Sequence, residues 1–276
     1  MLTDKIYIVK ANGEKEAFIA EKLEQSLARA GASGTVTSSI VTHIEKELQE
    51  GMSTSQIYKH AFFLLEKAEK PTAYRYSLKR AVMDLGPSGF PFEDFVGALF
   101  KEKGFNVKTD QMVNGHCVEH EVDVVAWNEN KLIMCEAKFH NELGVKSDLK
   151  VALYVKARMD DLMGATFNFG KNRKLDEGWL ITNTKFSTSA IAYGACQNLT
   201  MIGWNYPSKG NLQEMIEDSG LHPLTCLSSL SNTNKSLLLK QGIVLCKALA
   251  ADPTILTNIG LDSETVTKIL DEIRVL

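Results

Sequence analysis

The sequence predicts an α/β (α+β) protein in which a small helical domain precedes a central mixed sheet flanked by helices, with a small helical segment at the end. Three observations carry this prediction. Helical hydrophobic spacing recurs four times before Gly86-Pro87. The middle of the chain then alternates as helix, three strands, helix, strand, helix and strand, an order that suits one sheet flanked by helices. After Pro223 only helices are predicted, so we expect three domains at residues 1–87, 88–221 and 222–276.

The first domain is predicted to hold one strand or hairpin and about four helices. Residues 4–10 alternate as a short strand that ends at the turn Asn12-Gly13. Ser53-x-x-Gln56 is a capping box, because a serine and a glutamine at this spacing can satisfy each other's backbone N–H groups at a helix start. The fourth helix is expected over residues 73–85, before the break at Gly86-Pro87.

In the rest of the chain, apolar spacing and turn residues place each further element. Period-2 runs and buried apolar runs predict strands, and the 3.6-residue period predicts helices. The strands outside the central hairpin are expected at 105–109, 179–182 and 200–204, and the helices at 92–100, 148–163, 187–197, 212–218, 235–249 and 263–273.

The centre of the second domain is predicted to be a β-hairpin. Two apolar runs, 118–127 and 132–139, are separated by the polar turn Asn128–Lys131. Alternating residues joined by such a short turn are typical of antiparallel strands. The turn fixes the register, because it makes Trp127 face Leu132.

Counting outward from that pair places Asp123 opposite Glu136, with Glu121 opposite Lys138 on the same face. Facing carboxylates have Cβ atoms roughly 4.5–5.5 Å apart and destabilise a sheet. A hard divalent cation reverses this effect, because Mg²⁺ binds one or two carboxylates and keeps several waters. Such an ion lowers the pKa of a bound water and stabilises charge on a phosphoryl oxygen, while Lys138 can orient that water or neutralise the phosphate. These residues predict metal-assisted phosphodiester hydrolysis.

This arrangement resembles a known nuclease superfamily. Asp123 followed by EAK at 136–138 resembles the D…(D/E)-x-K core of the restriction-endonuclease-like (PD-(D/E)XK) superfamily. The preceding FEDFV at 92–96 and KGF at 103–105 resemble the start of Mrr-type restriction endonuclease domains. The proline of the superfamily name is absent, since HEV at 120–122 precedes the aspartate.

The resemblance implies a DNA endonuclease that uses Mg²⁺ or Mn²⁺. It implies that Asp123 and Glu136 bind the metal, that Glu93 joins them, and that Lys138 is catalytic. An alternative is a non-catalytic, nucleotide-responsive module in which the same fold only grips DNA or a protein, since an exposed E-x-K on a strand also arises by chance. RNA is a third possible substrate. Because double-strand cleavage needs two active sites, a homodimer is expected by analogy.

A second resemblance concerns the first domain. VKANG at 9–13, Phe18, Lys22 and AYRY at 73–76 resemble the ATP-cone, a small nucleotide-binding regulatory domain. The resemblance implies that ATP or dATP acts as a regulatory ligand. Ala-Asn at 11–12 replaces the Arg-Asp pair of the family pattern, so one cationic contact is missing. The residues implied to bind the nucleotide are Val9, Lys10, Gly13 and Lys22, although both lysines also suit a solvated surface.

Composition limits which cellular locations and which binding partners are expected. A net charge of −3 differs from the strong positive charge that is typical of nucleic-acid-binding proteins. Contacts to DNA would therefore need basic residues gathered on one face. No apolar window is long enough for a membrane span, no signal peptide is evident, and five cysteines without framework spacing fit a reducing compartment. We therefore expect a cytoplasmic protein without a membrane partner. His120 or His140 is expected at the rim of the metal site as a phosphate contact, and a zinc site is not expected because paired ligand spacings are missing.

Overall fold

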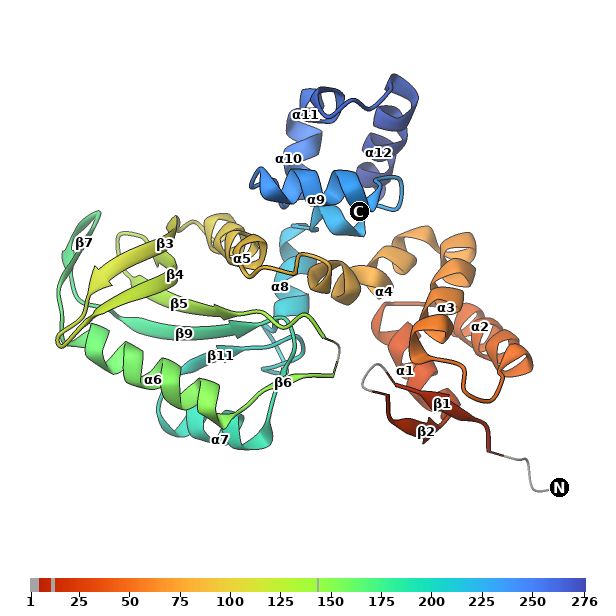
Figure 1. Ribbon diagram of the computed structural model, residues 1–276, viewed down its shortest axis with the longest axis horizontal. Helices are drawn as coiled ribbons and strands as arrows, with labels where there is room; N and C mark the ends of the chain where they lie inside the picture. The colour runs from red at the N-terminus through yellow and green to blue at the C-terminus, as the bar shows by residue number, and fades with distance from the viewer. Residues whose placement is uncertain (1–4, 11–12, 143) are drawn as a thin grey trace.

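The computed structural model describes residues 5–10, 13–142 and 144–276 and confirms the predicted fold class (Figure 1). Its centre is a five-stranded mixed sheet with the strand order β11-β9-β5-β4-β3. The strands β3, β4 and β5 are antiparallel neighbours, whereas β5, β9 and β11 run parallel. Their bounds are β3 Asn106–Asn114, β4 Glu119–Trp127, β5 Leu132–Lys138, β9 Glu177–Thr182 and β11 Thr200–Ile202.

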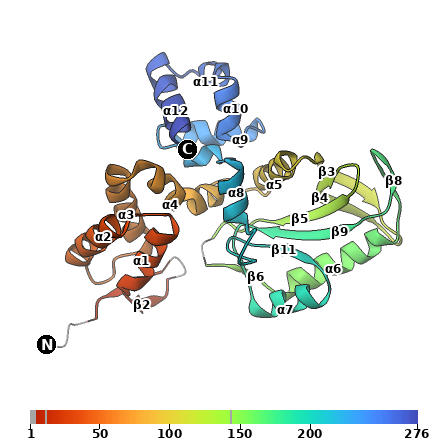
Figure 2. The same cartoon turned by 180° about the vertical axis from the view of Figure 1, so that it is seen from behind.

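Helices cover both faces of this sheet. On one face, Phe95 of α5 lies in the same buried cluster as Val124 of the sheet. On the other face, Val155 of α6 packs in a cluster with Val125 and Met134. Figures 1 and 2 show α6 and α7 on the side of the sheet opposite α5. The bounds are α5 Phe90–Glu102, α6 Leu149–Met163, α7 Thr188–Cys196 and α8 Leu212–Ser219, with the short strands β6 Lys146–Ser147, β7 Phe167–Phe169, β8 Lys171–Arg173 and β10 Lys185–Phe186.

The N-terminal part is a hairpin followed by four helices, with its own buried cluster between Ile8 and Ala73. The predicted capping box is confirmed, because the Ser53 side chain accepts from the Gln56 N–H and Gln56 Oε1 accepts from the Ser53 N–H at 2.8 Å. The elements are β1 Tyr7–Val9, β2 Lys15–Ala17, α1 Ala20–Arg29, α2 Gly34–Glu47, α3 Thr54–Ala68 and α4 Lys70–Met83.

The central hairpin has the predicted register near its turn. The pairs run from Trp127 with Leu132 to Val124 with Cys135, and the Asn128 side chain accepts two backbone N–H bonds inside the turn. The next predicted pair, Asp123 with Glu136, is not part of this ladder. The Asp123 carboxylate instead accepts the backbone N–H of the residue after Glu136 at 2.7 Å. The two acidic residues are therefore neighbours, but a side chain rather than a backbone carbonyl joins the strands there.

The C-terminal part is helical, but the helix predicted over residues 235–249 is wrong. The chain turns at Gly242, whose φ of +75° lies in the left-handed region that favours glycine, and two shorter helices result. This part joins the rest through α4, since Thr225 Oγ1 donates to the Ala81 carbonyl at 2.5 Å. Its elements are η1 Leu224–Cys226, α9 Asn232–Lys240, α10 Cys246–Ala251, α11 Thr254–Asn258 and α12 Ser263–Val275. No helix in the described ranges is long and apolar enough to cross a membrane.

Candidate active site

Four acidic residues from four consecutive elements interact at one edge of the hairpin. Glu93 stands in the first turn of α5, Asp110 in β3, Asp123 in β4 and Glu136 in β5. Three of these residues were predicted from the sequence, and Asp110 was not. Several negative charges in a partly buried place repel one another, so the pKa values of these carboxyl groups report how closely they interact.

Asp110 is brought to the site by a local irregularity of β3. Thr109 pairs with Val124 and Gln111 pairs with Val122, so the residue between them stands at the level of Asp123 without joining the ladder. Its φ of +51° lies in the left-handed region, which aspartate tolerates better than most residues. A residue in such a sparsely populated conformation is often found at a functional site.

Asp123 is partly buried between the strands. Burial raises its pKa, whereas the hydrogen bond from the Ala137 N–H and the charge of Arg158 oppose that rise. The charge of Asp110 raises it further. This carboxylate is therefore held in place by one backbone donor and destabilised by its acidic neighbours.

Glu136 carries a raised pKa of about 7, first because of burial and next because of the charge of Asp123. Its Oε2 atom forms an ion pair with Nη1 of Arg158 on α6. The exposed fractions of the two side chains are 16% and 12%, so the pair is largely removed from water. Arg158 Nη1 also donates to the Glu121 carbonyl at 3.0 Å.

Arg158 is held on its outer side by an aromatic ring. Its guanidinium carbon lies 4.8 Å from the ring centroid of Tyr154, and Nη2 donates to the Tyr154 hydroxyl. The Nε atom is buried and has no hydrogen-bond partner among the described residues. The guanidinium thus supplies the positive charge next to Glu136 and keeps one unsatisfied donor.

Glu93 has the most strongly raised pKa of the group, at about 8. Burial is the largest cause, followed by the charge of Asp123 and a hydrogen bond with Asp110. Glu93 therefore belongs to the same electrostatic cluster as the hairpin carboxylates, while its role as a metal ligand stays a prediction.

Lys138 is exposed at the end of β5, two residues beyond Glu136, with Thr182 of β9 as its neighbour in the sheet. Its charge also lowers the pKa of Glu136, after the larger effects of burial, Asp123 and Arg158. The structure thus brings Glu93, Asp123, Glu136 and Lys138 together, and adds Asp110 and Arg158.

The donor set suits a hard divalent cation, because it consists of partly buried carboxylates whose raised pKa values show that their negative charge is undercompensated. The site is not closed around a cation position. Among the described residues, a group of three possible ligands with all its donor atoms within 4.8 Å of one another is found elsewhere, at His43, Glu47 and His60. An ion at Glu136 would compete with Arg158 for the same carboxylate oxygen.

The two histidines expected at the rim are both engaged in hydrogen bonds. His120 Nε2 lies 2.7 Å from the Asp161 carboxylate, and His140 Nε2 lies 2.8 Å from Ser147 Oγ. Asp161 also accepts the Cys117 backbone N–H at 2.7 Å, so His120 helps to fasten the β3–β4 turn to α6. The phosphate contact expected of either histidine stays a prediction.

The residues implied to bind a nucleotide lie around the first hairpin. Lys10 Nζ lies 3.0 Å and Lys22 Nζ 3.1 Å from the same Glu16 carboxylate oxygen, so an acidic residue already occupies the space between them. Val9 pairs with Lys15 across the hairpin, and Gly13 has a φ of +82°. Ala11-Asn12, on which the resemblance also depended, lie outside the described residues.

Comparisons with known proteins identify two regions of the chain. A family model described as "Restriction endonuclease" matches residues 87–205, and one described as "AF1548-like, C-terminal" matches residues 222–276. An uncharacterised protein of Archaeoglobus fulgidus is 35% identical over 177 residues, which is 64% of this chain and 96% of that protein. The crystal structure of a protein of unknown function, AF1548, has a TM-score of 0.56 and 32% identity over 68% of this chain and 97% of its own.

Proposed function

The chain belongs to the same family as the uncharacterised A. fulgidus protein and AF1548, and from the restriction-endonuclease match over residues 87–205 we propose that it is a metal-dependent endodeoxyribonuclease. Residues 87–205 form a restriction-endonuclease-like domain. The more specific proposal rests on one observation: Asp123, Glu136 and Glu93 form a partly buried, mutually repelling cluster of carboxylates, with Lys138 at its exposed border.

In this proposal Asp123 and Glu136 hold Mg²⁺ or Mn²⁺ with the help of Glu93. When bound, the metal supplies a more acidic water and stabilises negative charge on a phosphoryl oxygen. The Ala137 N–H orients the Asp123 carboxylate through its 2.7 Å bond. Lys138 donates from the exposed end of β5 toward the phosphate or the attacking water, where a fixed positive charge lowers the barrier.

Plasmid cleavage with Mg²⁺ or Mn²⁺ tests the proposal. We expect Lys138→Ala to lose roughly 100-fold or more of the cleavage rate, the usual effect of removing one transition-state donor. Lys108→Ala is the matched control, because Lys108 is also a lysine on a strand of the same sheet. Equal rates for wild type and Lys138→Ala, with and without nucleotides, would refute the catalytic role.

One observation favours the alternative, a nucleotide-responsive module that binds DNA or a protein without cutting it. Arg158 pairs with Glu136 Oε2, an oxygen that a metal ion would otherwise bind, so part of the acidic charge is compensated without a metal. The alternative predicts DNA binding that is measurable in EDTA and unchanged by Mg²⁺, with no strand cut under any nucleotide condition.

The proposal has three further parts. First, ATP or dATP is the effector, and the implied contacts of an N-terminal ATP-cone are Val9, Lys10, Gly13 and Lys22. Second, the protein acts as a homodimer when it cuts both strands. Third, the domains span residues 1–87, 88–221 and 222–276. The buried cluster between Ile8 and Ala73 lies wholly in the first range and supports that unit. The other two clusters are centred on the second and third ranges, but each also includes residues of the first range: Leu78, Val82 and Leu85 in one, and Ala81 in the other. Light scattering of the purified protein, with and without ATP, tests the dimer and its dependence on the effector.

A further inference from the structure

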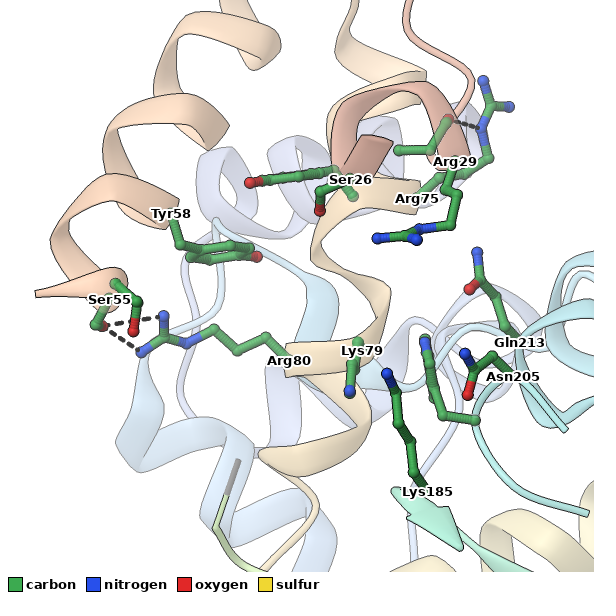
Figure 3. A pocket seen from close by; sticks show the side chains of 14 residues that line it. Ser26, Arg29, Ser55, Tyr58, Arg75, Lys79, Arg80, Lys185, Asn205 and Gln213 are labelled. Atoms are coloured by element: carbon green, nitrogen blue, oxygen red, sulfur yellow. Dashed lines mark hydrogen bonds between the residues drawn. The ribbon is translucent and has the colours of Figure 1, made fainter. Parts of the chain in front are cut away.

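A cavity of about 360 Å³ lies where the N-terminal helices meet the sheet domain (Figure 3). Its walls come from α1, α3 and α4 on one side, and from β10, the segment after β11 and α8 on the other. The volume falls within the range of pockets that bind small molecules and cofactors. None of Val9, Lys10, Gly13 and Lys22 lines it.

The cavity is strongly basic, and none of the described residues that line it is acidic. Five cationic side chains line it: Arg29, Arg75, Lys79, Arg80 and Lys185. Figure 3 shows the tips of Lys79 and Lys185 next to each other, whereas Arg80 extends toward Ser55. Within the described part of the chain, none of the five has a carboxylate within 4.0 Å, whereas ion pairs elsewhere in the protein join lysines and arginines to acids at shorter distances. The charges of Arg75 and Arg80 favour the ionised forms of Glu69 and Asp84, so these two cations are partly balanced. The remaining positive charge at Arg29, Lys79 and Lys185 favours a ligand that brings several negative charges.

Hydrogen bonds fix two of the cations, Arg75 and Arg80, in position. Arg75 Nε donates to the Ala30 carbonyl at 2.8 Å, which holds its guanidinium at the end of α1. Both terminal nitrogens of Arg80 lie 3.4 Å from Ser55 Oγ. Burial lowers the pKa of Lys79 to about 8, and the nearby charges of Lys185 and Arg29 act in the same direction. A bound anion would reduce the electrostatic repulsion between these cations.

Aromatic rings stand beside the cations. Tyr58 and Tyr76 are stacked with ring centroids 5.1 Å apart and planes at 13°. The guanidinium of Arg80 lies 5.1 Å from the centroid of Tyr58, and Lys79 Nζ lies 6.0 Å from the centroid of Trp204. Flat apolar surfaces next to phosphate-binding cations suit a ligand that joins a heteroaromatic base to phosphates.

We propose that this cavity is the binding site of a nucleoside polyphosphate, and that the ligand bridges the N-terminal helices and the nuclease domain. This proposal rests on the proposed function only in taking a nucleotide as the effector. It places the nucleotide at the junction between the domains instead of at the first hairpin. The phosphates lie among Lys79, Lys185 and Arg29, and the base lies against the aromatic side chains of the cavity wall.

Lys185 lies shortly after β9, which pairs with β5, the strand that carries Glu136 and Lys138, so a ligand bound to Lys185 can affect that strand. Lys185 follows Thr182 by three residues, and Thr182 is the neighbour of Lys138 in the sheet. α4 also touches the same loops, because Asn183 Nδ2 lies 3.0 Å from the sulfur of Met83. A ligand that draws Lys185 toward α4 therefore acts on the segment directly after β9.

Calorimetric titration with ATP, dATP, ADP and inorganic triphosphate tests the proposal. The protein is the full chain carrying Lys138→Ala, so that binding is read without DNA cleavage and independently of whether the protein is a nuclease. We expect ATP to bind more tightly than triphosphate, and the added pair Lys79→Gln and Lys185→Gln to weaken ATP binding at least tenfold. The matched pair Lys10→Gln and Lys22→Gln is expected to change it less than twofold.

Arg29→Gln serves as the second probe, because Arg29 is exposed and its replacement leaves the core intact. We expect it to weaken ATP binding alone by about threefold to tenfold, the effect of losing one charge-assisted contact. Three results would overturn the proposal: no heat with any nucleotide, loss of binding only in the Lys10 and Lys22 pair, or weakened binding of a 20-base-pair duplex with unchanged ATP binding. The last result would assign the cavity to DNA.

Discussion

The raised pKa of Glu136 predicts that the metal-free protein becomes less stable as pH rises. In the folded protein this carboxyl has a pKa of about 7, compared with an ordinary value of 4.5. Between these values the folded state keeps a proton that the unfolded chain has released, so the free energy of unfolding falls with increasing pH. The stabilisation is fully present below about pH 4.5 and is lost as the pH reaches about 7.

The magnitude follows from the same values. A pKa displaced from 4.5 to about 7 corresponds to roughly 3 kcal/mol, because each unit contributes about 1.4 kcal/mol. Glu93, with a pKa of about 8, acts in the same direction over a wider interval. The two groups share Asp123 as a cause, so their effects are not independent and the total is smaller than the sum.

Urea unfolding followed by circular dichroism, in EDTA at pH 5, 6, 7 and 8, measures this loss. Glu136→Gln is the perturbation, and Glu119→Gln, an exposed position on β4, is the control. Glutamine mimics the protonated carboxyl group, so the Glu136→Gln variant is expected to match wild type near pH 5. Its stability is expected to fall with pH by roughly 3 kcal/mol less than that of wild type, which makes it the more stable protein at pH 8. Parallel pH profiles for wild type and Glu136→Gln would refute the reasoning.

Three other perturbations follow from the site. Mg²⁺ at pH 8 is expected to raise the melting temperature of wild type and not of Asp123→Asn; equal gains in scanning calorimetry would show that the ion binds elsewhere. Arg158→Met is expected to cost about 3 kcal/mol in EDTA, since it leaves a largely buried carboxylate unpaired, and less in Mg²⁺, which urea titrations in both buffers can check. Asp110→Gly is expected to raise metal-free stability by about 1 kcal/mol, because glycine accepts the φ of +51° and one repelling charge is removed; a decrease in the same titration would contradict this.

The hairpin was predictable because its determinants are local. Alternation and a short polar turn fix the pairing of Trp127 with Leu132, and the register then holds for three further pairs, to Val124 with Cys135. Beyond that point the pairing depends on a third strand. Asp110 of β3 leaves the ladder at the level of Asp123, and no pattern in the β4–β5 segment indicates this.

Arg158 shows a second limit of sequence reasoning. Its helix was predicted, and its basic character was evident, but which residue of the helix faces which residue of the sheet depends on how the two elements pack. The ion pair with Glu136 spans 22 residues and is set by that packing. By contrast, the break in the predicted helix over residues 235–249 had a visible signal in Gly242, which the apolar spacing on both sides outweighed.

The two groups of lysines show why charge alone does not identify an anion site. Lys10 and Lys22 were chosen for their sign and their place in a motif, yet both already bind the Glu16 carboxylate. A phosphate at that hairpin must displace or share this acid, which reduces what it gains. Lys79 and Lys185 come from distant parts of the chain and meet in a cavity without an acid, where the charge of Lys185 lowers the pKa of Lys79. An anion gains more at the second place, and that difference in electrostatic free energy is the reason to look for the effector between the domains.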